Sequence, residues 1–450
     1  MIIKSKLSPF VKVTDFFANE YVDYSSYDNL RKIASIIDGQ KNASRKVLWT
    51  LIKKNIKSEV KVSQLSSNIE QYTEYLHGSI AGVLTNMGKD YAGTNNLPLV
   101  QKSGNFGTRF IKDPSATRYI YASGSKNLFN YFDKNDTKNL IHQSFEGDDI
   151  EPRFLIPTLP ILLINGSEGA ISSGFSQEIL PRNPDEIKKI VLNKLDGGKR
   201  RAKMTPYYNG FKGVIIQGET HKQWLIKGCI ARLSPNRVQI SEIPTGNTLK
   251  GYTKFLDKLE DDKFISSYTD KSEDDKFLFE VKIPSKVLGK MTDDEVLSKL
   301  KLIKTVSENY TCINHLNKIQ VFENVEEMVD AFIDVKNKFM EFRKDSLIQE
   351  YNEDFRIAES KYKFIKMVTE DKIVINKRKK DDIIKELYSI GDKFFEIDGK
   401  LDYLLAMKIT SLTKENMKEL KESAKIAKQN LAELKSKTPQ DLLIEDINSI

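Results

Sequence analysis

The chain has 450 residues, of which 39% are hydrophobic and 30% are charged. This length allows two to four compact units, and the two cysteines, Cys229 and Cys312, are too few for a disulfide framework or a cysteine-ligated zinc site. Lys and Arg number 71 against 63 Asp and Glu, so the net charge is +8, an excess that indicates a polyanionic partner where basic residues cluster.

The sequence offers no candidate membrane span. Its longest apolar stretch, residues 155–164, is broken by Pro157 and Pro160 and is far shorter than the ~20 residues a span requires. The start, MIIKSKLSPFVKV, has a lysine where a signal peptide has its apolar core, and no small-residue cleavage site follows. We expect a soluble protein in a reducing compartment, the cytoplasm, or the host cytoplasm if the source is viral.

Several common catalytic motifs are missing from the sequence. There is no G-x-x-x-x-G-K-[ST] loop and no G-x-G pair, so ATP or a dinucleotide is not expected to bind by the usual loops. The G-x-S-x-G elbow and the H-E-x-x-H helix are missing, and the four histidines are scattered. An Asp-x-Asp pair is also missing, so Mg²⁺ would be held mainly by another chain or by weaker pairs such as Asp293 and Glu295, for which a solvated first helical turn is the alternative.

The first 150 residues alternate helical patterns with short apolar strands, and basic residues gather near their start. Over residues 45–53 the apolar side chains recur at helical spacing while Arg45, Lys46 and Lys53 take the other face. A basic helix beside a second short helix at 63–76 fits a helix-turn-helix unit on DNA. An ordinary amphipathic surface helix would show the same pattern.

Residues 151 to about 330 are punctuated by Gly and Pro and contain alternating stretches at 237–243 and 277–283, which predict a mixed α+β domain. A basic run follows Gly197 and Gly198 and consists of Lys199, Arg200, Arg201 and Lys203. Such a run is either a solvated loop or a contact with phosphate.

From residue 335 the chain becomes helical and rich in Lys and Glu. Apolar residues are spaced 4, 3, 4, 3 in two stretches, which are Tyr351, Phe355, Ala358, Tyr362, Ile365 and Leu420, Ala424, Ala427, Leu431, Leu434. They predict an antiparallel coiled coil with a small helical knob at about 371–408, and the first helix is expected over 336–369. A long arm ending in an apolar knob suggests a dimer; two helices packed on the main body are the alternative.

The stretch GNFGTRFIKDPSATRYIYASGS, residues 104–125, carries the candidate chemistry. Gly104–Asn105–Phe106–Gly107 predicts a tight turn that lets the backbone approach a ligand, and a short apolar strand is expected over 119–122. A tyrosine can attack a phosphodiester when a cation stabilises the developing charge, so Tyr119 is the candidate nucleophile and Arg118 the cation. Alone, the pair also fits a strand tyrosine beside a surface arginine.

A series of motifs in fixed order resembles the breakage-reunion subunit of type IIA DNA topoisomerases. These motifs, which span about residues 28–420, are RKIASIIDGQKNASRKVLW, YLHGS, GNFG, SATRYIYAS, IEPRFLIPTLPILLINGSEGAISSGFSQEILPRNPDEI, PYYNGFKG, ISEIP and MKITSLTKE. Within the family the motifs look most similar to the medium subunit of T-even-type bacteriophage enzymes. In those enzymes the ATPase and the metal ligands lie on a separate large subunit.

The resemblance implies that Tyr119 forms a 5′-phosphotyrosyl link to DNA and Arg118 stabilises the pentacovalent phosphorus. It also implies a set of DNA-binding residues, which are Arg31, Lys41, Arg45, Lys46, His77, Gly104, Asn105 and Ile171. Ile171 would be the wedge between base pairs, although core packing is its alternative. Departures from the family pattern are Tyr75 for the first histidine of a H-x-H-G turn, Asn42 for a proline and Ser44 for a basic residue.

The expected fold is α+β, with an N-terminal arm (1–27), a winged-helix domain (28–150), a mixed α/β tower (151–334), a coiled coil with a C-gate dimerisation knob (335–435) and a tail (436–450). The expected function is ATP-dependent relaxation or decatenation of double-stranded DNA. Expected partners are a large subunit that binds ATP and Mg²⁺ and a second copy of the chain. A catalytically inactive DNA-bending homologue is the alternative, whereas a tyrosine recombinase lacks support because no His-x-x-Arg motif occurs.

Overall fold

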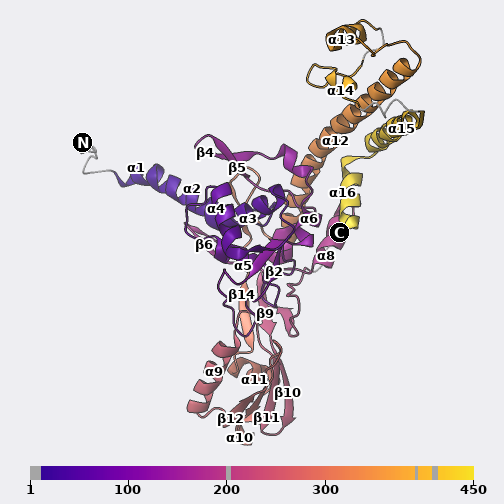
Figure 1. The fold of residues 1–450 in the computed structure, drawn as a ribbon. Helices are drawn as coiled ribbons and strands as arrows, with labels where there is room; N and C mark the ends of the chain where they lie inside the picture. Colours follow the sequence, from indigo (N-terminus) through magenta and orange to yellow (C-terminus); the bar gives the residue numbers. More distant parts are fainter. Residues whose placement is uncertain (1–11, 199–203, 391–393, 408–413) are drawn as a thin grey trace. The chain divides into compact units, whose positions relative to one another are not determined.

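The computed structural model describes residues 12–198, 204–390, 394–407 and 414–450 (Figure 1). The chain forms two compact units, one of Met1–Lys336 with Asp446–Ile450 and one of Asn337–Glu445. The basic run at 199–203 and most of the MKITSLTKE motif lie outside the described residues. Within the described ranges, no helix is both long and apolar enough to cross a membrane.

The N-terminal part of the first unit is a helical layer on a small antiparallel sheet. Its sheet has the order β1-β3-β2. α3 forms because Val47, Leu48 and Leu51 recur at helical spacing and are fully buried, which confirms the helix predicted at 45–53. The elements are α1 (Val13–Ala18), α2 (Glu20–Lys32), α3 (Asn42–Lys53), β1 (Val60–Lys61), α4 (Val62–Tyr72), α5 (Ala81–Met87), β2 (Val100–Ser103) and β3 (Tyr121–Gly124).

The next segment joins this layer to the rest of the first unit and contains two hairpins, β4–β5 and β6–β7. In the second hairpin Ser172 pairs with Phe175, so Ser173 and Gly174 alone form the turn, and Gly174 has the positive φ of 77° that such turns favour. The elements are α6 (Lys126–Tyr131), η1 (Asp136–Asn139), β4 (His142–Phe145), β5 (Asp148–Pro152), α7 (Ile161–Asn165), β6 (Ser167–Ser172), β7 (Phe175–Ile179) and α8 (Pro184–Leu195).

Residues 214–321 form the mixed α/β part of the first unit. One sheet has the order β10-β11-β13-β12 and another β14-β9-β8. The strands predicted from alternation are β11 and β13, whose inward residues pack with α9 and α11 in one apolar core. The elements are β8 (Val214–Gln217), β9 (Gln223–Lys227), β10 (Cys229–Ser234), β11 (Arg237–Glu242), α9 (Leu249–Asp261), β12 (Ser267–Asp270), β13 (Phe279–Lys282), α10 (Ser285–Leu288), α11 (Asp293–Lys299), β14 (Ile303–Ser307), β15 (Thr311–Ile313) and β16 (Ile319–Val321).

The second unit is helical. α12 and α15 run antiparallel, because the Thr369 hydroxyl contacts Met417 at one end and the Lys344 ammonium contacts the Lys435 carbonyl at the other. Phe364, Ile365 and Leu420 join one apolar cluster with α13 and α14. The elements are α12 (Val325–Thr369), α13 (Lys380–Ser389), α14 (Asp402–Leu405), α15 (Lys414–Ser436) and α16 (Pro439–Ser449).

Some element boundaries differ from those expected. α12 ends at Thr369 as predicted but begins at Val325, because Val325, Met328, Val329 and Phe332 are buried in the first unit and continue the helical pattern upstream. α2 crosses the expected arm boundary at residue 28 without interruption, since residues 20–32 contain neither Gly nor Pro. The second helix of the expected helix-turn-helix ends at Tyr72 rather than residue 76.

Buried ion pairs connect distant segments of the first unit. The Arg182 guanidinium lies 2.6 and 2.7 Å from the two carboxylate oxygens of Glu308, and both side chains are at most 1% exposed. Glu308 also accepts hydrogen bonds from the Trp224 indole and the Tyr310 hydroxyl, each at 2.7 Å. These additional donors satisfy the carboxylate, which is the condition for burying such a pair without a large penalty.

We therefore expect Glu308→Ala to lower the free energy of unfolding of the first unit by about 3–5 kcal/mol, because it leaves Arg182 charged and buried. Urea unfolding followed by tryptophan fluorescence measures this, since Trp49 and Trp224 both lie in that unit. Glu323→Ala is the matched control: its exposed ion pair with Lys222 should contribute less than about 1 kcal/mol. Equal losses in the two variants would contradict the prediction.

Candidate active site around Tyr119

Tyr119 lies in a turn and not in the strand predicted for residues 119–122, because β3 begins two residues later. Its amide donates to the Ala116 carbonyl at 2.9 Å, and the Ser63 amide at the start of α4 donates to the Thr117 carbonyl at 3.2 Å. These bonds hold the turn against the helical layer and leave the tyrosine 67% exposed. The Arg118 guanidinium lies 4.8 Å from the centre of the Tyr119 ring, a cation–π distance.

The predicted turn at 104–107 is present and organises the loop that leads to Tyr119. Gly104 and Gly107 have φ of 90° and 93°, and a Cβ on Gly107 would lie 2.4 Å from the Lys112 carbonyl oxygen. The Asn105 side chain accepts from the Gly107 amide at 2.8 Å, and its carbonyl accepts from the Ser115 amide at 2.9 Å. Asn105 thus holds both the start of the loop, at Gly107, and its end, at Ser115.

Arg109 anchors this same loop to the mixed α/β part. Its guanidinium lies 2.6 Å from the Glu242 carboxylate and donates to the Ile243 carbonyl at 2.9 Å. Its Cζ also lies 4.7 Å from the centre of the Phe277 ring. Arg109 and Glu242 are both buried, and breaking their contact would leave a buried charge unpaired, so the loop is held firmly at this point.

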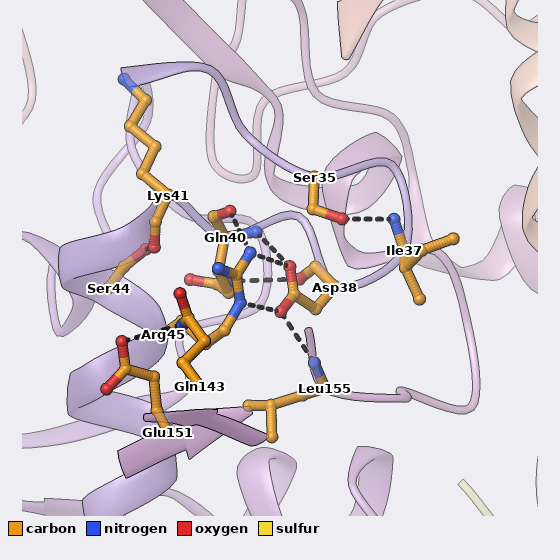
Figure 2. Close-up of polar contacts among 10 residues, drawn as sticks. All are labelled: Ser35, Ile37, Asp38, Gln40, Lys41, Ser44, Arg45, Gln143, Glu151 and Leu155. Carbon is orange, nitrogen blue, oxygen red and sulfur yellow. Dashed lines mark hydrogen bonds and ion pairs between the residues drawn. The ribbon is translucent and has the colours of Figure 1, made fainter. Parts of the chain in front are cut away.

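A second turn, at Asp38–Gly39, sets the start of α3 (Figure 2). The fully buried Asp38 carboxylate accepts from the Gln40 amide at 2.9 Å, from Arg45 at 2.7 and 3.2 Å, and from the Leu155 amide at 2.9 Å. Gly39 is required because a Cβ there would lie 2.5 Å from the Leu162 amide nitrogen. Arg45, expected to line DNA, is instead buried in this pair, which does not fit direct contact with a ligand.

Lys41, unlike the buried Arg45, faces a cleft. It is the N-cap residue of α3 and points away from the Asp38–Arg45 pair (Figure 2). It lines a cleft of about 480 Å³ together with Ser44, Asn86 and Asn95. Burial lowers the pKa of Lys41, and an anion in the cleft would offset that effect.

A hollow of about 320 Å³ adjoins this cleft and shares Asn86, Asn95 and Glu168 with it. Lys89 and Lys112 line the hollow, and burial lowers the pKa of both ammonium groups. Burial raises the pKa of the Glu168 carboxyl. Lys41, Lys89 and Lys112 therefore line one depression on the surface. Sequence reasoning did not identify Lys89 and Lys112, because no periodic pattern marks their positions.

Arg31, Lys46 and His77 line a separate pocket of about 280 Å³. Lys46 is buried and its ammonium lies 2.7 Å from the Glu151 carboxylate, so, like Arg45, it is engaged by the protein. His77 is exposed, and its Nε2 lies 2.5 Å from the Tyr27 hydroxyl. The structure thus brings the three predicted basic residues together, with one of them neutralised.

Ile171 lies on β6 beside the turn of the β6–β7 hairpin and is 75% exposed. The alternative of core packing is therefore wrong. An isoleucine this exposed contributes little to the stability of the fold through burial, and its side chain is accessible to another molecule.

The departures from the family pattern have local structural roles. Asn42 takes the first position of α3, where a proline would be favoured, and the Ser44 hydroxyl donates to the Lys41 carbonyl at 3.0 Å. The Tyr75 ring packs edge-on to His77 at 6.1 Å. Across the part of the chain that the structure describes, no group of three or more His, Cys, Asp or Glu side chains could hold a metal ion.

Comparison with known proteins identifies the family to which the chain belongs. A model of the family described as the A subunit of DNA gyrase and topoisomerase IV matches residues 31–448. The chain belongs to this gyrase and topoisomerase IV family. The DNA-binding, cleavage and re-ligation domain of topoisomerase II from Plasmodium falciparum superposes with a TM-score of 0.88 at 30% identity, over 96% of this chain and 63% of that one.

Relatives of this family member include eukaryotic enzymes. The mitochondrial DNA topoisomerase 2 of Dictyostelium discoideum is 32% identical over 97% of this chain and 35% of that protein. DNA topoisomerase 2 of Arabidopsis thaliana is 30% identical over 98% of this chain and 33% of that protein. The chain thus spans about a third of the length of these curated relatives. The expected special likeness to bacteriophage enzymes is not supported, because these relatives are eukaryotic.

The different placements of Arg45 and Lys41 predict different effects of their removal. Arg45→Ala should lower the free energy of unfolding by about 3–5 kcal/mol, because it leaves the Asp38 carboxylate buried without its cation. Lys41→Ala should change it by less than about 1 kcal/mol, since its ammonium faces the cleft. Urea unfolding compares the two variants, and a stable Arg45→Ala protein would show that Asp38 does not depend on the pair.

Proposed function

We propose that this chain cleaves and rejoins double-stranded DNA for a type II topoisomerase, with Tyr119 as the nucleophile. The observation that carries the proposal is an exposed tyrosine beside an arginine, on a turn held by Asn105, Arg109 and α4. A nucleophile must meet its target in a defined orientation, and this anchored turn restricts the orientations of the phenol while leaving the side chain accessible.

In the proposed reaction the phenolic oxygen of Tyr119 forms a bond to a DNA phosphorus, and the bond from that phosphorus to the 3′ oxygen breaks. The tyrosine loses its proton to solvent and the departing 3′ oxygen gains one, so a 3′-hydroxyl and a 5′-phosphotyrosyl link result. Arg118 stabilises the negative charge that grows on the phosphoryl oxygens. One phosphodiester replaces another, so the reverse reaction reseals the strand without an energy source.

Phosphate contacts along the bound strands are assigned to Lys41, Arg31 and His77, with the backbone of Gly104 and Asn105 next to the turn. Arg45 and Lys46 are assigned positioning roles, because each is buried against a carboxylate. Ile171 is the proposed wedge that enters between base pairs and bends the duplex, which its exposure at a hairpin turn supports.

Type II topoisomerases use Mg²⁺ and ATP, and we propose that both are bound by polypeptide outside these 450 residues, on a large partner subunit. The family description names one subunit of a larger enzyme, which supports a partner. The described residues contain no cluster of donors that fits Mg²⁺, so no step above is assigned to a metal held by this chain.

We also propose that two copies of the chain assemble through the knob at 371–408, so that two Tyr119 residues make a double-strand break. Exposed apolar side chains in the knob, Val374, Tyr388 and Ile397, support this surface. A second duplex would pass through the break, which relaxes or decatenates DNA.

Tyr119→Phe should abolish covalent attachment to DNA, because phenylalanine lacks the attacking oxygen. The assay traps cleavage of supercoiled plasmid with denaturant, in the presence of magnesium and the partner subunit. Tyr121→Phe, two residues along, is the matched control and should retain attachment. Linear DNA with protein on both 5′ ends supports the proposal. Wild type that bends DNA without any adduct would favour the inactive architectural homologue instead.

Lys41→Ala should lower the magnitude of the salt dependence of DNA binding by about 0.9, the value for one phosphate contact. Fluorescence anisotropy with a short duplex over a range of KCl concentrations measures the slope of log K against log salt. Lys254→Ala, which changes an exposed lysine of α9 outside the lysine-lined cleft and hollow, is the control and should leave the slope unchanged. Equal slopes for wild type and Lys41→Ala would remove this contact from the proposal.

A further inference from the structure

One turn of α2 touches two separate parts of the proposed DNA site. The Tyr27 hydroxyl lies 2.5 Å from Nε2 of His77. The next residue, Asp28, accepts from the Ser173 amide at 3.0 Å and from the Ser173 hydroxyl at 3.1 Å. Ser173 is in the turn of the hairpin that carries Ile171, so consecutive residues of one helix reach the histidine turn and the hairpin.

The hairpin side of this contact is extensive. The Ser172 hydroxyl donates to the Asn29 side chain, and Asn29 is buried. Beside these polar contacts, Leu30 and Ile33 pack with Ala170 of β6 in an apolar cluster. Ile171 therefore stands between two residues that are tied to this segment while its own side chain is 75% exposed.

Asp28 is charged when it makes these contacts. Its other carboxylate oxygen lies 2.8 Å from the Lys32 ammonium one turn along. The hydrogen bond with Lys32 is the largest cause that holds the pKa of the Asp28 carboxyl below its usual value. The hydrogen bonds from Ser173 lower it further. A charged acceptor makes a stronger hydrogen bond than a neutral one, so Ser173 is held more firmly than a neutral side chain would hold it.

The histidine side is a small aromatic cluster. The Tyr27 and Tyr75 rings flank His77 at 6.2 and 6.1 Å. When the Tyr27 hydroxyl donates to a neutral His77 imidazole, Nε2 is the acceptor and Nδ1 carries the proton. In that form Nδ1 is a donor, which suits a phosphate oxygen.

We propose that residues 27–29 form a strut that sets the position of the wedge relative to His77, with Asp28 and Asn29 positioning Ile171 and Tyr27 positioning His77. The proposal rests on the proposed function, because it concerns the same DNA site. An α-helix is stiff over one turn and rises 1.5 Å per residue, so neither contact can shift far without the other. One turn of α2 thereby positions both the wedge and the histidine, each through its own contact.

The test compares Asp28→Ala and Tyr27→Phe in the 450-residue chain. Asp23→Ala and Tyr24→Phe are matched controls, since both residues are exposed on the same helix. Energy transfer between dyes at the two ends of a duplex reports bending. Nitrogen-15 labelling of histidine reports the protonation of each ring, and the sequence has four histidines, so His77→Gln identifies the signals of His77.

We expect Asp28→Ala to lower the fraction of bent duplex about fivefold or more, as the loss of charge-assisted hydrogen bonds predicts. A duplex with a flexible gap at the wedge position should restore full bending, because that DNA needs no wedge to kink. Tyr27→Phe should shift the His77 signals towards a mixture of the two neutral forms while bending stays the same. The two control variants should behave as wild type in both measurements.

Wild-type bending by Asp28→Ala, or unchanged His77 signals in Tyr27→Phe, would overturn the strut. Loss of bending by Asp23→Ala as well would overturn it too, because the effect would then belong to the helix in general. Failure of the proposed function has a different signature: wild type itself would form no adduct through Tyr119. Wild type that forms the adduct and bends DNA, beside an unaffected Asp28→Ala, would reject the strut alone.

Discussion

The buried carboxylate of Asp38 holds three segments of the first unit together. It accepts hydrogen bonds from the Gln40 amide, from Arg45 on α3 and from the Leu155 amide. A carboxylate without exposure to water is tolerated only when such donors surround it, so the three segments must meet for the fold to be stable. The meeting point fixes the first turn of α3 and thereby turns Lys41 towards the cleft.

The same device recurs elsewhere in the first unit. Lys46 with Glu151, Arg109 with Glu242 and Arg182 with Glu308 are each buried and each join different segments. Every such pair is neutral as a unit, so the net charge of +8 remains with the other residues of the chain. The cations that form the interior scaffold and those that face the cleft are therefore two separate sets, although Lys41 lies only four residues before Arg45.

Local patterns predicted much of this structure, and tertiary partners account for what they missed. Helical spacing predicted α3 and the end of α12, and alternation predicted β11 and β13. Spacing could not show that Arg45 and Lys46 are buried, because their carboxylate partners depend on the fold and one lies 105 residues away. Tyr119 was expected in a strand, but β3 begins only at Tyr121, because the Thr117 carbonyl in the preceding turn accepts a hydrogen bond from the Ser63 amide. The exposure of Ile171 likewise follows from its place beside a hairpin turn and not from its hydrophobicity.

The contact between Arg109 and Glu242 joins residues that are 133 positions apart in the chain. During synthesis at about 5–20 residues per second, the loop that presents Tyr119 waits on the order of ten seconds for its anchor to be made. In a nascent chain, Tyr119 therefore lies first on a loop without its anchor. The loop is fixed only after Glu242 has been synthesised. The order of synthesis itself therefore delays the assembly of the candidate active site until the mixed α/β part that carries Glu242 has been made.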